Sequence, residues 1–228
     1  MKAQRLRVTF SRGEELKYIT HLDLMRFWER ALRRAGVPLS YSEGFSPHAQ
    51  IAMASPLAVG TTSEAELMDV FLEEPMRPRE FSERVTCQLT PGIRIVGVRE
   101  AGLALPSLQA DVRFAVYDVD LPQSPNVDAA DAVERFLAAE SVPWEHKRED
   151  EVRSYDIRRL VQSIELVRGD PLRLRMVLKN DNDGSGRPEQ VVAALGLPPT
   201  SRIHRTRIVL AATSPARDAW RKRGRFGA

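Results

Sequence analysis

Two histidines, one carboxylate and an aromatic loop are the parts of this sequence best suited to chemistry. His48 closes the segment Tyr41 to His48 (YSEGFSPH), which has almost no helix or strand periodicity and lies between two strongly patterned segments. Such loops often carry sites. His21 and Asp23 lie at the start of the helix-like run before this loop. If that helix start meets the loop, His21, Asp23 and His48 are candidate catalytic residues for proton transfer, or a weak metal site.

A structural role for His21 competes with this interpretation. His21 falls on the apolar edge of its predicted helix, where a lone histidine is usually a structural residue. Glu66 and Asp69 follow the loop in a predicted half-buried strand, and alternation places them on opposite faces. One of these two carboxylates can therefore face the site.

The predicted helix near Thr20 to Ala35 has an apolar side and a strongly cationic side. The cationic side carries four arginines: Arg26, Arg30, Arg33 and Arg34. This ridge is suited to phosphate, and Tyr41 and Phe45 in the adjoining loop are suited to stacking on bases. Asp23 and Glu29 flank the ridge, so a solvated charged face is the commoner meaning of the same pattern.

Three further segments concentrate polar side chains in the second half of the chain. They are SYDIRRL with Arg158, a glycine-rich loop with Arg187, and RIHRTR with Arg205, and we take these arginines as candidate phosphate-binding residues. In RIHRTR, strand alternation sends Arg205 and Arg207 to one face and His204 to the other. Edge-strand solubilisation explains that pattern about as well as ligand binding does.

The order of predicted elements in the first half is β-α-β-β-α-β. The segments are a strand Leu6 to Phe10, a helix Thr20 to Ala35, extended pieces Pro38 to Ser42 and Gln50 to Ala54, a strand Ala65 to Leu72, a helix Pro78 to Leu89 and a strand Ile93 to Val98. This order is that of a ferredoxin-like domain with an elaborated first crossover.

The second half repeats this order. Its segments are a strand Val112 to Asp120, a helix Val127 to Ala139, extended pieces Val142 to Lys147 and Ile157 to Val167, a strand Leu172 to Lys179, a helix Pro188 to Leu195 and a strand Ile203 to Leu210. The sequence therefore predicts an α+β protein of two tandem ferredoxin-like units, residues 1–105 and 106–213, followed by a basic tail, residues 214–228.

Composition narrows the class of protein. With 228 residues, 43% of them apolar, the chain can fill two cores, and no apolar run approaches the roughly 18 residues of a membrane span. The amphipathic start lacks a signal core, so we expect a cytoplasmic protein without a membrane partner. The single cysteine, Cys87, excludes intrachain disulfides and any iron–sulfur cluster made by this chain alone, so no cofactor is expected. We expect Cys87 to be buried.

The positive charge is concentrated in the tail. From Arg217 on there are five basic residues and one acid, which leaves 29 basic and 30 acidic residues in the rest of the chain. Such a tail can clamp phosphates or dock on an acidic partner. A solvated, disordered terminus is at least as common.

The run from Tyr18 to Val70 resembles a bacterial family of unknown function, the radical-SAM-linked proteins, which occur alone or joined behind a radical-SAM domain. The segments EHKREDEVRSYDIRRLV and RIHRTR match more weakly. This resemblance implies association with a radical-SAM protein and with RNA metabolism, and it supplies no catalytic residue. The three-cysteine cluster motif is absent, so the chain would be the accessory half of such a pair.

Three hypotheses about function follow. The leading one is an accessory module, rather than an enzyme on its own, that binds RNA or presents substrate to a radical-SAM enzyme in RNA modification or processing. The second is an acid/base enzyme using His21 and His48, for example in RNA cleavage, since metal-independent ribonucleases also use ferredoxin-like repeats. The third is a protein-binding adaptor whose arginines meet an acidic partner.

Overall fold

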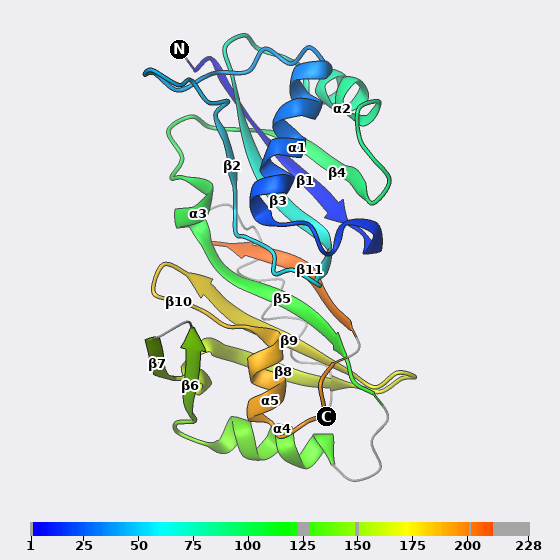
Figure 1. Cartoon of the computed structure of the whole chain (residues 1–228), viewed down its shortest axis with the longest axis vertical. Coiled ribbons are helices and arrows are strands. Elements are labelled where there is room, and N and C mark those ends of the chain that lie inside the picture. The colour runs from blue at the N-terminus through cyan, green and yellow to red at the C-terminus, as the bar shows by residue number, and fades with distance from the viewer. Residues whose placement is uncertain (1, 123–127, 149–150, 201, 212–228) are drawn as a thin grey trace.

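The computed structural model describes residues 2–122, 128–148, 151–200 and 202–211 (Figure 1). The predicted basic tail, residues 214–228, lies outside these ranges. The predicted α+β class is confirmed, because five helices accompany a nine-stranded sheet and a separate two-stranded sheet in the described residues. In the same ranges, no helix is long and apolar enough to span a bilayer.

The first half places three long strands side by side. Its elements are β1 (Gln4–Arg12), η1 (Glu14–Leu16), α1 (His21–Arg34), β2 (Ile51–Met53), β3 (Thr62–Leu72), α2 (Pro78–Thr86) and β4 (Ile93–Ala101). β1 lies between β3 and β4 and is antiparallel to both, and β2 pairs with the other side of β3. The spatial order is therefore β2-β3-β1-β4.

The second half has the same arrangement with two additions. Its elements are α3 (Leu108–Asp111), β5 (Val112–Asp120), α4 (Ala129–Ala138), β6 (Pro143–Arg148), β7 (Glu151–Asp156), η2 (Ile157–Leu160), β8 (Val161–Val167), β9 (Arg173–Asp181), β10 (Gly184–Ser185), α5 (Pro188–Ala194) and β11 (Arg202–Leu210). β5 lies between β9 and β11, and β8 pairs with β9, which gives the order β8-β9-β5-β11. The β6–β7 hairpin and the short strand β10 are the additions.

Strand β11 joins the two halves into one sheet. It pairs in parallel with β3 through His204 opposite Thr62 and Arg205 opposite Ser63, while its other side pairs with β5. β11 therefore lies in the middle of the sheet, and the interpretation of RIHRTR as an edge strand is wrong. The register shifts between Arg205 and Arg207, so a β-bulge breaks the strand alternation assumed from the sequence.

Each half has its own apolar core under its helices. In the first half, Trp28 of α1 meets Phe10 of β1 in an edge-to-face contact with ring centroids 4.9 Å apart. The second core collects Phe136 of α4 and Val191 of α5. Figure 1 shows α1 and α5 in front of the same sheet. A small third cluster that includes Leu108 joins the halves.

Helix α1 begins where the sequence predicted. The Thr20 hydroxyl oxygen accepts a hydrogen bond from the Asp23 backbone N–H at 3.2 Å, and the same hydroxyl donates to the Asp23 carboxylate at 2.7 Å. This cap occupies one of the unpaired N–H groups of the first turn. Cys87, in contrast, is exposed at the end of α2 rather than buried. Phe81 and Val85 take the buried face of that helix, and Cys87 falls off it.

A buried charged cluster fastens the segment after β4 to the first half. Asp69 is fully buried and accepts hydrogen bonds from Arg5 Nε and Arg7 Nε, each at 2.7 Å. The remaining nitrogens of Arg5 donate to the backbone oxygens of Leu105 and Pro106 at 3.0 Å. The chain that leads into the second half is therefore held by the sheet of the first.

Candidate nucleic-acid interface

The two histidines that the sequence suggested as acid and base lie at opposite ends of the first half. His21 opens α1, and the charges that act on its pKa are those of Glu66 and Arg12, near the junction with β11. His48 lies beyond the other end of α1, a helix of 14 residues and hence about 21 Å long. Figure 1 shows the loop before β2 at the end far from β11. The structure does not bring His21 and His48 together.

Asp23 and the neighbouring charges also lack the arrangement of a metal site. The Asp23 carboxylate belongs to the helix cap and lies 3.6 Å from Arg26. Burial lowers the pKa of His21, and the nearby Glu66 raises it by less. Among the described residues, no group of three or more histidine, cysteine, aspartate or glutamate side chains is placed to hold a metal ion. The acid/base hypothesis therefore loses its geometric basis.

The loop from Tyr41 to His48 is built to display one side chain. Ser42 and His48 join the two ends of the loop. The Ser42 backbone N–H donates to the His48 backbone oxygen at 2.9 Å, and the His48 backbone N–H donates to the Ser42 hydroxyl oxygen at 3.0 Å. Tyr41 is half-buried against the first core, whereas Phe45 at the tip is fully exposed, at 109%. Gly44 supports this tip with a φ of 129°. Of the two aromatic residues, Phe45 is free to stack on a base.

All four arginines of the α1 ridge are exposed: Arg26, Arg30, Arg33 and Arg34. Two of them lie near an acid on the same helix, Arg26 at 3.6 Å from Asp23 and Arg33 at 3.5 Å from Glu29. Exposed pairs of this kind contribute at most about 1 kcal/mol, so a phosphate can displace them. Within the described residues, Arg30 has no acidic partner.

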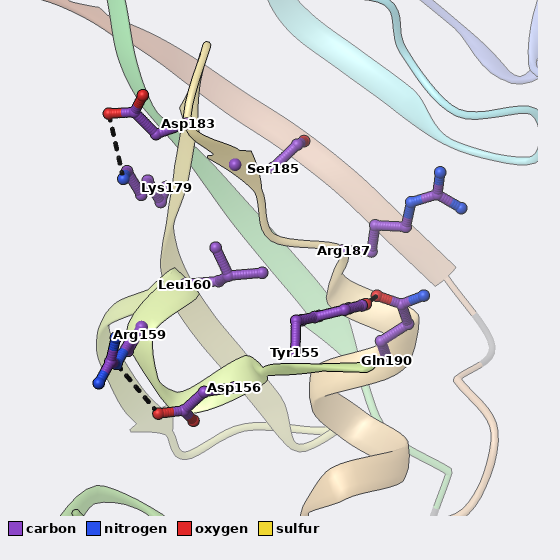
Figure 2. Close-up of a pocket in the computed structure, with 10 residues that line it drawn as sticks. Tyr155, Asp156, Arg159, Leu160, Lys179, Asp183, Ser185, Arg187 and Gln190 are labelled. Atoms are coloured by element: carbon purple, nitrogen blue, oxygen red, sulfur yellow. Dashed lines mark hydrogen bonds and ion pairs between the residues drawn. The ribbon is translucent and has the colours of Figure 1, made fainter. Parts of the chain in front are cut away.

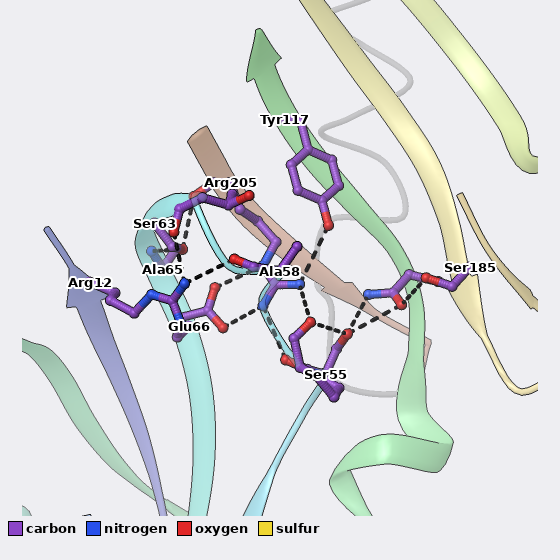
Figure 3. Close-up of polar contacts among 12 residues, drawn as sticks. Arg12, Ser55, Ala58, Ser63, Ala65, Glu66, Tyr117, Ser185 and Arg205 are labelled. Atoms are coloured by element: carbon purple, nitrogen blue, oxygen red, sulfur yellow. Dashed lines mark hydrogen bonds and ion pairs between the residues drawn. The ribbon is translucent and has the colours of Figure 1, made fainter. Parts of the chain in front are cut away.

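Arg205 does not face solvent, so its prediction as a phosphate-binding residue is wrong. The side chain is fully buried, and its Nε donates to Glu66 Oε1 at 2.8 Å while its Nη2 bonds the other Glu66 oxygen (Figure 3). Tyr117 Oη lies 3.5 Å from Arg205 Nη1. The bulge at Thr206 turns Arg205 inward and leaves Arg207 exposed.

Arg12 is the second arginine buried beside Glu66. It is 1% exposed, and its Nη2 donates to the backbone oxygens of Ala58 and Thr61 at 3.0 and 2.9 Å. Burial lowers the pKa of Arg12, and the Glu66 carboxylate acts against this effect. We call Arg12, Glu66, Tyr117 and Arg205 the junction cluster. The sequence pointed to Glu66 as a carboxylate that can face a site, but it offered no reason to place two arginines around it.

A partly open cavity lies in the second half, between η2, the β9–β10 hairpin and α5 (Figure 2). Its volume is about 580 Å³, and it is called the β10 pocket below. It is lined by Tyr155, Asp156, Arg159, Leu160, Lys179, Asp183, Gly184, Ser185, Arg187 and Gln190. Arg187, a predicted phosphate-binding residue, therefore lies at a cavity.

Arg158 turns away from this pocket, in contrast to its neighbour Arg159. Its two terminal nitrogens donate to the backbone oxygens of Val161 at 3.0 Å and Leu137 at 3.2 Å. Arg158 thus holds η2 against the end of α4, and its predicted role in phosphate binding has no exposed guanidinium to support it. The motif SYDIRRL was the right segment, and it contributes Tyr155, Asp156, Arg159 and Leu160, rather than Arg158, to the pocket.

The charges around the β10 pocket are unevenly paired. Arg159 lies 3.3 Å from Asp156, and Lys179 lies 3.5 Å from Asp181 and 3.8 Å from Asp183. Arg187 is exposed, and no carboxylate pairs with it in the part of the chain that the structure describes. The pocket therefore offers one unneutralised cation at its rim.

Tyr155 supplies the aromatic surface of the pocket. Its hydroxyl donates to Gln190 Oε1 at 2.6 Å, which fixes the ring against α5. Burial raises the pKa of Tyr155, and the nearby positive charge of Arg187 partly offsets this. The phenol is therefore a neutral donor at physiological pH. A fixed neutral ring beside a free guanidinium can hold a planar ligand that carries a negative group.

Two glycines allow the hairpin to approach η2 closely. A Cβ on Gly184 would lie 2.8 Å from the Leu160 side chain, and one on Gly186 would lie 3.0 Å from the Leu160 backbone oxygen. The turn is fastened by Asp181, whose Oδ1 accepts from the backbone N–H groups of Asp183 and Gly184 at 2.9 and 3.1 Å. The glycine-rich loop thus forms one wall of the β10 pocket.

Together these features define a mixed α+β protein with one continuous sheet, an arginine-covered helix and a polar pocket. The chain belongs to DUF2344, described as an uncharacterized protein conserved in bacteria, whose family model matches residues 5–188. None of the curated proteins matches the chain significantly.

Two solved structures resemble the chain over most of its length. One is a Cbf5-Nop10-Gar1 complex, with a TM-score of 0.48, 10% identity and coverage of 91% of this chain and 49% of the other. The second is an archaeal box H/ACA sRNP Nop10-Cbf5 complex, with a TM-score of 0.41, 12% identity and coverage of 91% and 48%. This chain therefore spans about half the length of either matched chain. With both scores below 0.5, neither structure assigns a site or an activity to this protein.

Proposed function

We propose that this protein is an RNA-binding accessory module. The observation that carries the proposal is the α1 ridge, where four arginines are exposed on one helix and held by no more than weak surface contacts. Guanidinium groups recognise phosphates bidentately, and RNA backbones present phosphates at regular spacing. Phe45, exposed at the tip of the loop that follows α1, adds a surface on which an unpaired base can stack.

A radical-SAM enzyme is the proposed partner, in RNA modification or processing in the cytoplasm. The resemblance of Tyr18 to Val70 to radical-SAM-linked proteins supports this part of the proposal. The chain has one cysteine, so the partner would carry the three-cysteine cluster motif. In this scheme, the present chain binds the RNA and presents it, and the partner performs the chemistry.

The scaffold in this proposal is a pair of ferredoxin-like units, residues 1–105 and 106–213. The strand orders β2-β3-β1-β4 and β8-β9-β5-β11, each with two helices between the strands, support it. Sheets of this kind leave helix faces and loops free to bind nucleic acid. The basic tail, residues 214–228, adds further cations to this proposal.

The test is the salt dependence of RNA binding. The full chain is titrated with an unfractionated bacterial tRNA pool at several salt concentrations, and the affinity should fall steeply as salt rises. Replacing Arg26, Arg30, Arg33 and Arg34 by glutamine should weaken binding at least tenfold. The slope of log K against log salt should also fall in magnitude by up to about 3, since each lost phosphate contact removes about 0.7 to 0.9.

A matched control removes the same charge elsewhere. Arg77, Arg79, Arg94 and Arg99 are exposed on α2 and β4, and their replacement by glutamine should reduce binding far less. Equal losses in the two variants would show that binding is a general charge effect and would overturn the role of the ridge. Binding without a salt slope, or no binding at all, would overturn RNA recognition and leave the adaptor hypothesis.

A further inference from the structure

The β10 pocket has the size of a small-molecule site. Its volume of about 580 Å³ falls within the roughly 300 to 1,000 Å³ typical of cavities that take cofactors and nucleotides. It joins apolar surface from Tyr155 and Leu160 with a few polar groups from the β9–β10 hairpin. We infer that this pocket takes one unstacked base of an RNA strand, with Tyr155 as the stacking surface and Arg187 as the contact to the adjoining phosphate. This inference rests on the proposed RNA-binding function.

The Tyr155 ring is prepared for stacking before any ligand arrives. Its hydroxyl is held by Gln190 at 2.6 Å, and the residue packs against the second core. A side chain already fixed loses little conformational entropy when a base stacks on it. Figure 2 shows the ring nearly edge-on beside Leu160, so a flat ligand on the ring face would lie between an aromatic and an aliphatic surface.

The distribution of charge separates a place for a base from a place for a phosphate. Among the lining residues, Arg159 and Lys179 each lie near a carboxylate, that of Asp156 and of Asp183, although Arg159 and Asp183 are themselves largely exposed. Backbone hydrogen bonds, first that of Val142, lower the pKa of Asp156, so this carboxylate stays charged and opposes an anion in the interior. Arg187 at the rim has no acidic partner among the described residues. A neutral base therefore fits inside and a phosphate fits at the rim.

Two arms distinguish a base of RNA from a free nucleotide, which has the same chemistry. In the first arm, AMP, GMP, CMP, UMP and inorganic phosphate are titrated by calorimetry into the full chain. A mononucleotide should bind and inorganic phosphate should bind at least tenfold more weakly.

In the second arm, the tRNA pool is titrated into variants. Tyr155→Ala should weaken RNA binding about 5- to 150-fold, the range expected for one lost base stack, and Tyr155→Phe should stay within about threefold of the wild type.

Arg187 and the pocket wall give two further variants. Arg187→Ala should weaken RNA binding and reduce the salt slope by about 0.7, the value of one phosphate on a single strand. Arg168→Ala, which removes an exposed arginine outside the pocket, is its control and should change neither the affinity nor the salt slope.

A second pocket variant is needed because Tyr155→Ala can disturb the core. Ser185 is exposed, so Ser185→Trp fills the cavity without touching the core.

The outcomes distinguish two hypotheses: that the β10 pocket binds a base, called the base pocket here, and that the protein binds RNA at all. If the wild type binds RNA while Tyr155→Ala, Ser185→Trp and Arg187→Ala bind as tightly as Arg168→Ala, the base pocket is overturned and RNA binding stands. The base pocket is also overturned if mononucleotides bind but no pocket variant changes RNA affinity, which would identify the ligand as a free nucleotide. Inorganic phosphate that binds as well as a mononucleotide overturns it too. If the wild type binds no RNA, the proposed function and the inference fall together.

Discussion

The junction cluster and the β10 pocket both gather cationic side chains, but they differ in what those cations face. In the junction cluster, Arg205 and Arg12 are buried. Arg205 Nε donates to Glu66, and Arg12 Nη2 donates to backbone oxygens. In the β10 pocket, Arg187 is exposed and is not paired with any carboxylate among the described residues. Residue type alone does not distinguish these arginines. An arginine held by the fold is buried beside a carboxylate or backbone oxygens, whereas one available to a ligand is exposed and has no carboxylate partner among the described residues.

A second difference concerns which part of the molecule each group supports. The junction cluster connects β3 to β11 and so connects the two halves of the sheet. The β10 pocket is bounded by a turn and by elements of the second half alone. Changes in the junction cluster should therefore reduce stability, and changes in the β10 pocket should reduce binding.

Loss of the buried Glu66 carboxylate should lower the free energy of unfolding more than any other change predicted here. Glu66→Gln leaves Arg12 and Arg205 buried without a negative partner, and breaking such a pair typically costs about 3 to 5 kcal/mol of unfolding free energy. Urea unfolding followed by circular dichroism measures this change. Asp183→Asn removes one negative charge from the β10 pocket, where the carboxylate is 85% exposed, and should change stability by less than about 0.5 kcal/mol.

Equal effects of these two substitutions would remove the distinction between the junction cluster and the β10 pocket. A more specific experiment replaces both members of the buried pair, as Glu66→Leu with Arg205→Met. Because neither charge of this pair then remains, the double variant should be more stable than Glu66→Gln. A double variant as unstable as the single one would show that Arg12, rather than the pair, dominates the junction cluster.

A change of pH should alter stability by a smaller amount, through His204 beside the junction cluster. His204 Nδ1 lies 2.7 Å from Thr62 Oγ1, with Glu64 3.8 Å from the other ring nitrogen. Burial, followed by the charge of Arg202, lowers the pKa of His204 below its usual 6.5. The unfolded chain therefore binds a proton first as pH falls, so this contribution to stability is complete above about pH 6.5 and is lost below it.

Unfolding midpoints measured between pH 5 and pH 8 test whether stability falls as the pH falls. The wild type should lose stability as pH falls through this range, and His204→Gln should lose less. His21, whose pKa burial also lowers, keeps part of the dependence in the variant. A wild type that becomes more stable toward pH 5, or a variant with an unchanged pH dependence, would contradict the placement of a neutral His204 in the sheet.

Local features of the sequence predicted much of the scaffold. The start of α1 and its apolar face depend on neighbouring residues, so they could be found without coordinates. The position of β11 depends on pairing between Arg205 and Ser63, which are far apart in the chain. The bulge at Thr206 lies in the pairing of β11 with β5, which is also distant in the chain, and it separates Arg205 from Arg207, which strand alternation had placed on one face.

The candidate site was only partly predictable for the same reason. The arginines of α1 and the exposed Phe45 follow from helix periodicity and loop composition, and Arg187 was found from the glycine-rich loop. Tyr155 was missed although its motif had been singled out, because its importance comes from its contact with Gln190 across the fold. The meeting of His21 and His48 was ruled out by the length of α1.

Crosslinking is the most direct test of RNA binding by the part of the chain that the structure describes. The full chain is irradiated with ultraviolet light in the presence of the tRNA pool, and the crosslinked peptides are mapped by mass spectrometry. We expect crosslinks on the peptide that carries Phe45 and on the peptide that carries Tyr155, since both offer a ring to a base. Crosslinks confined to residues 214–228, or none at all, would show that the part of the chain that the structure describes does not hold the RNA.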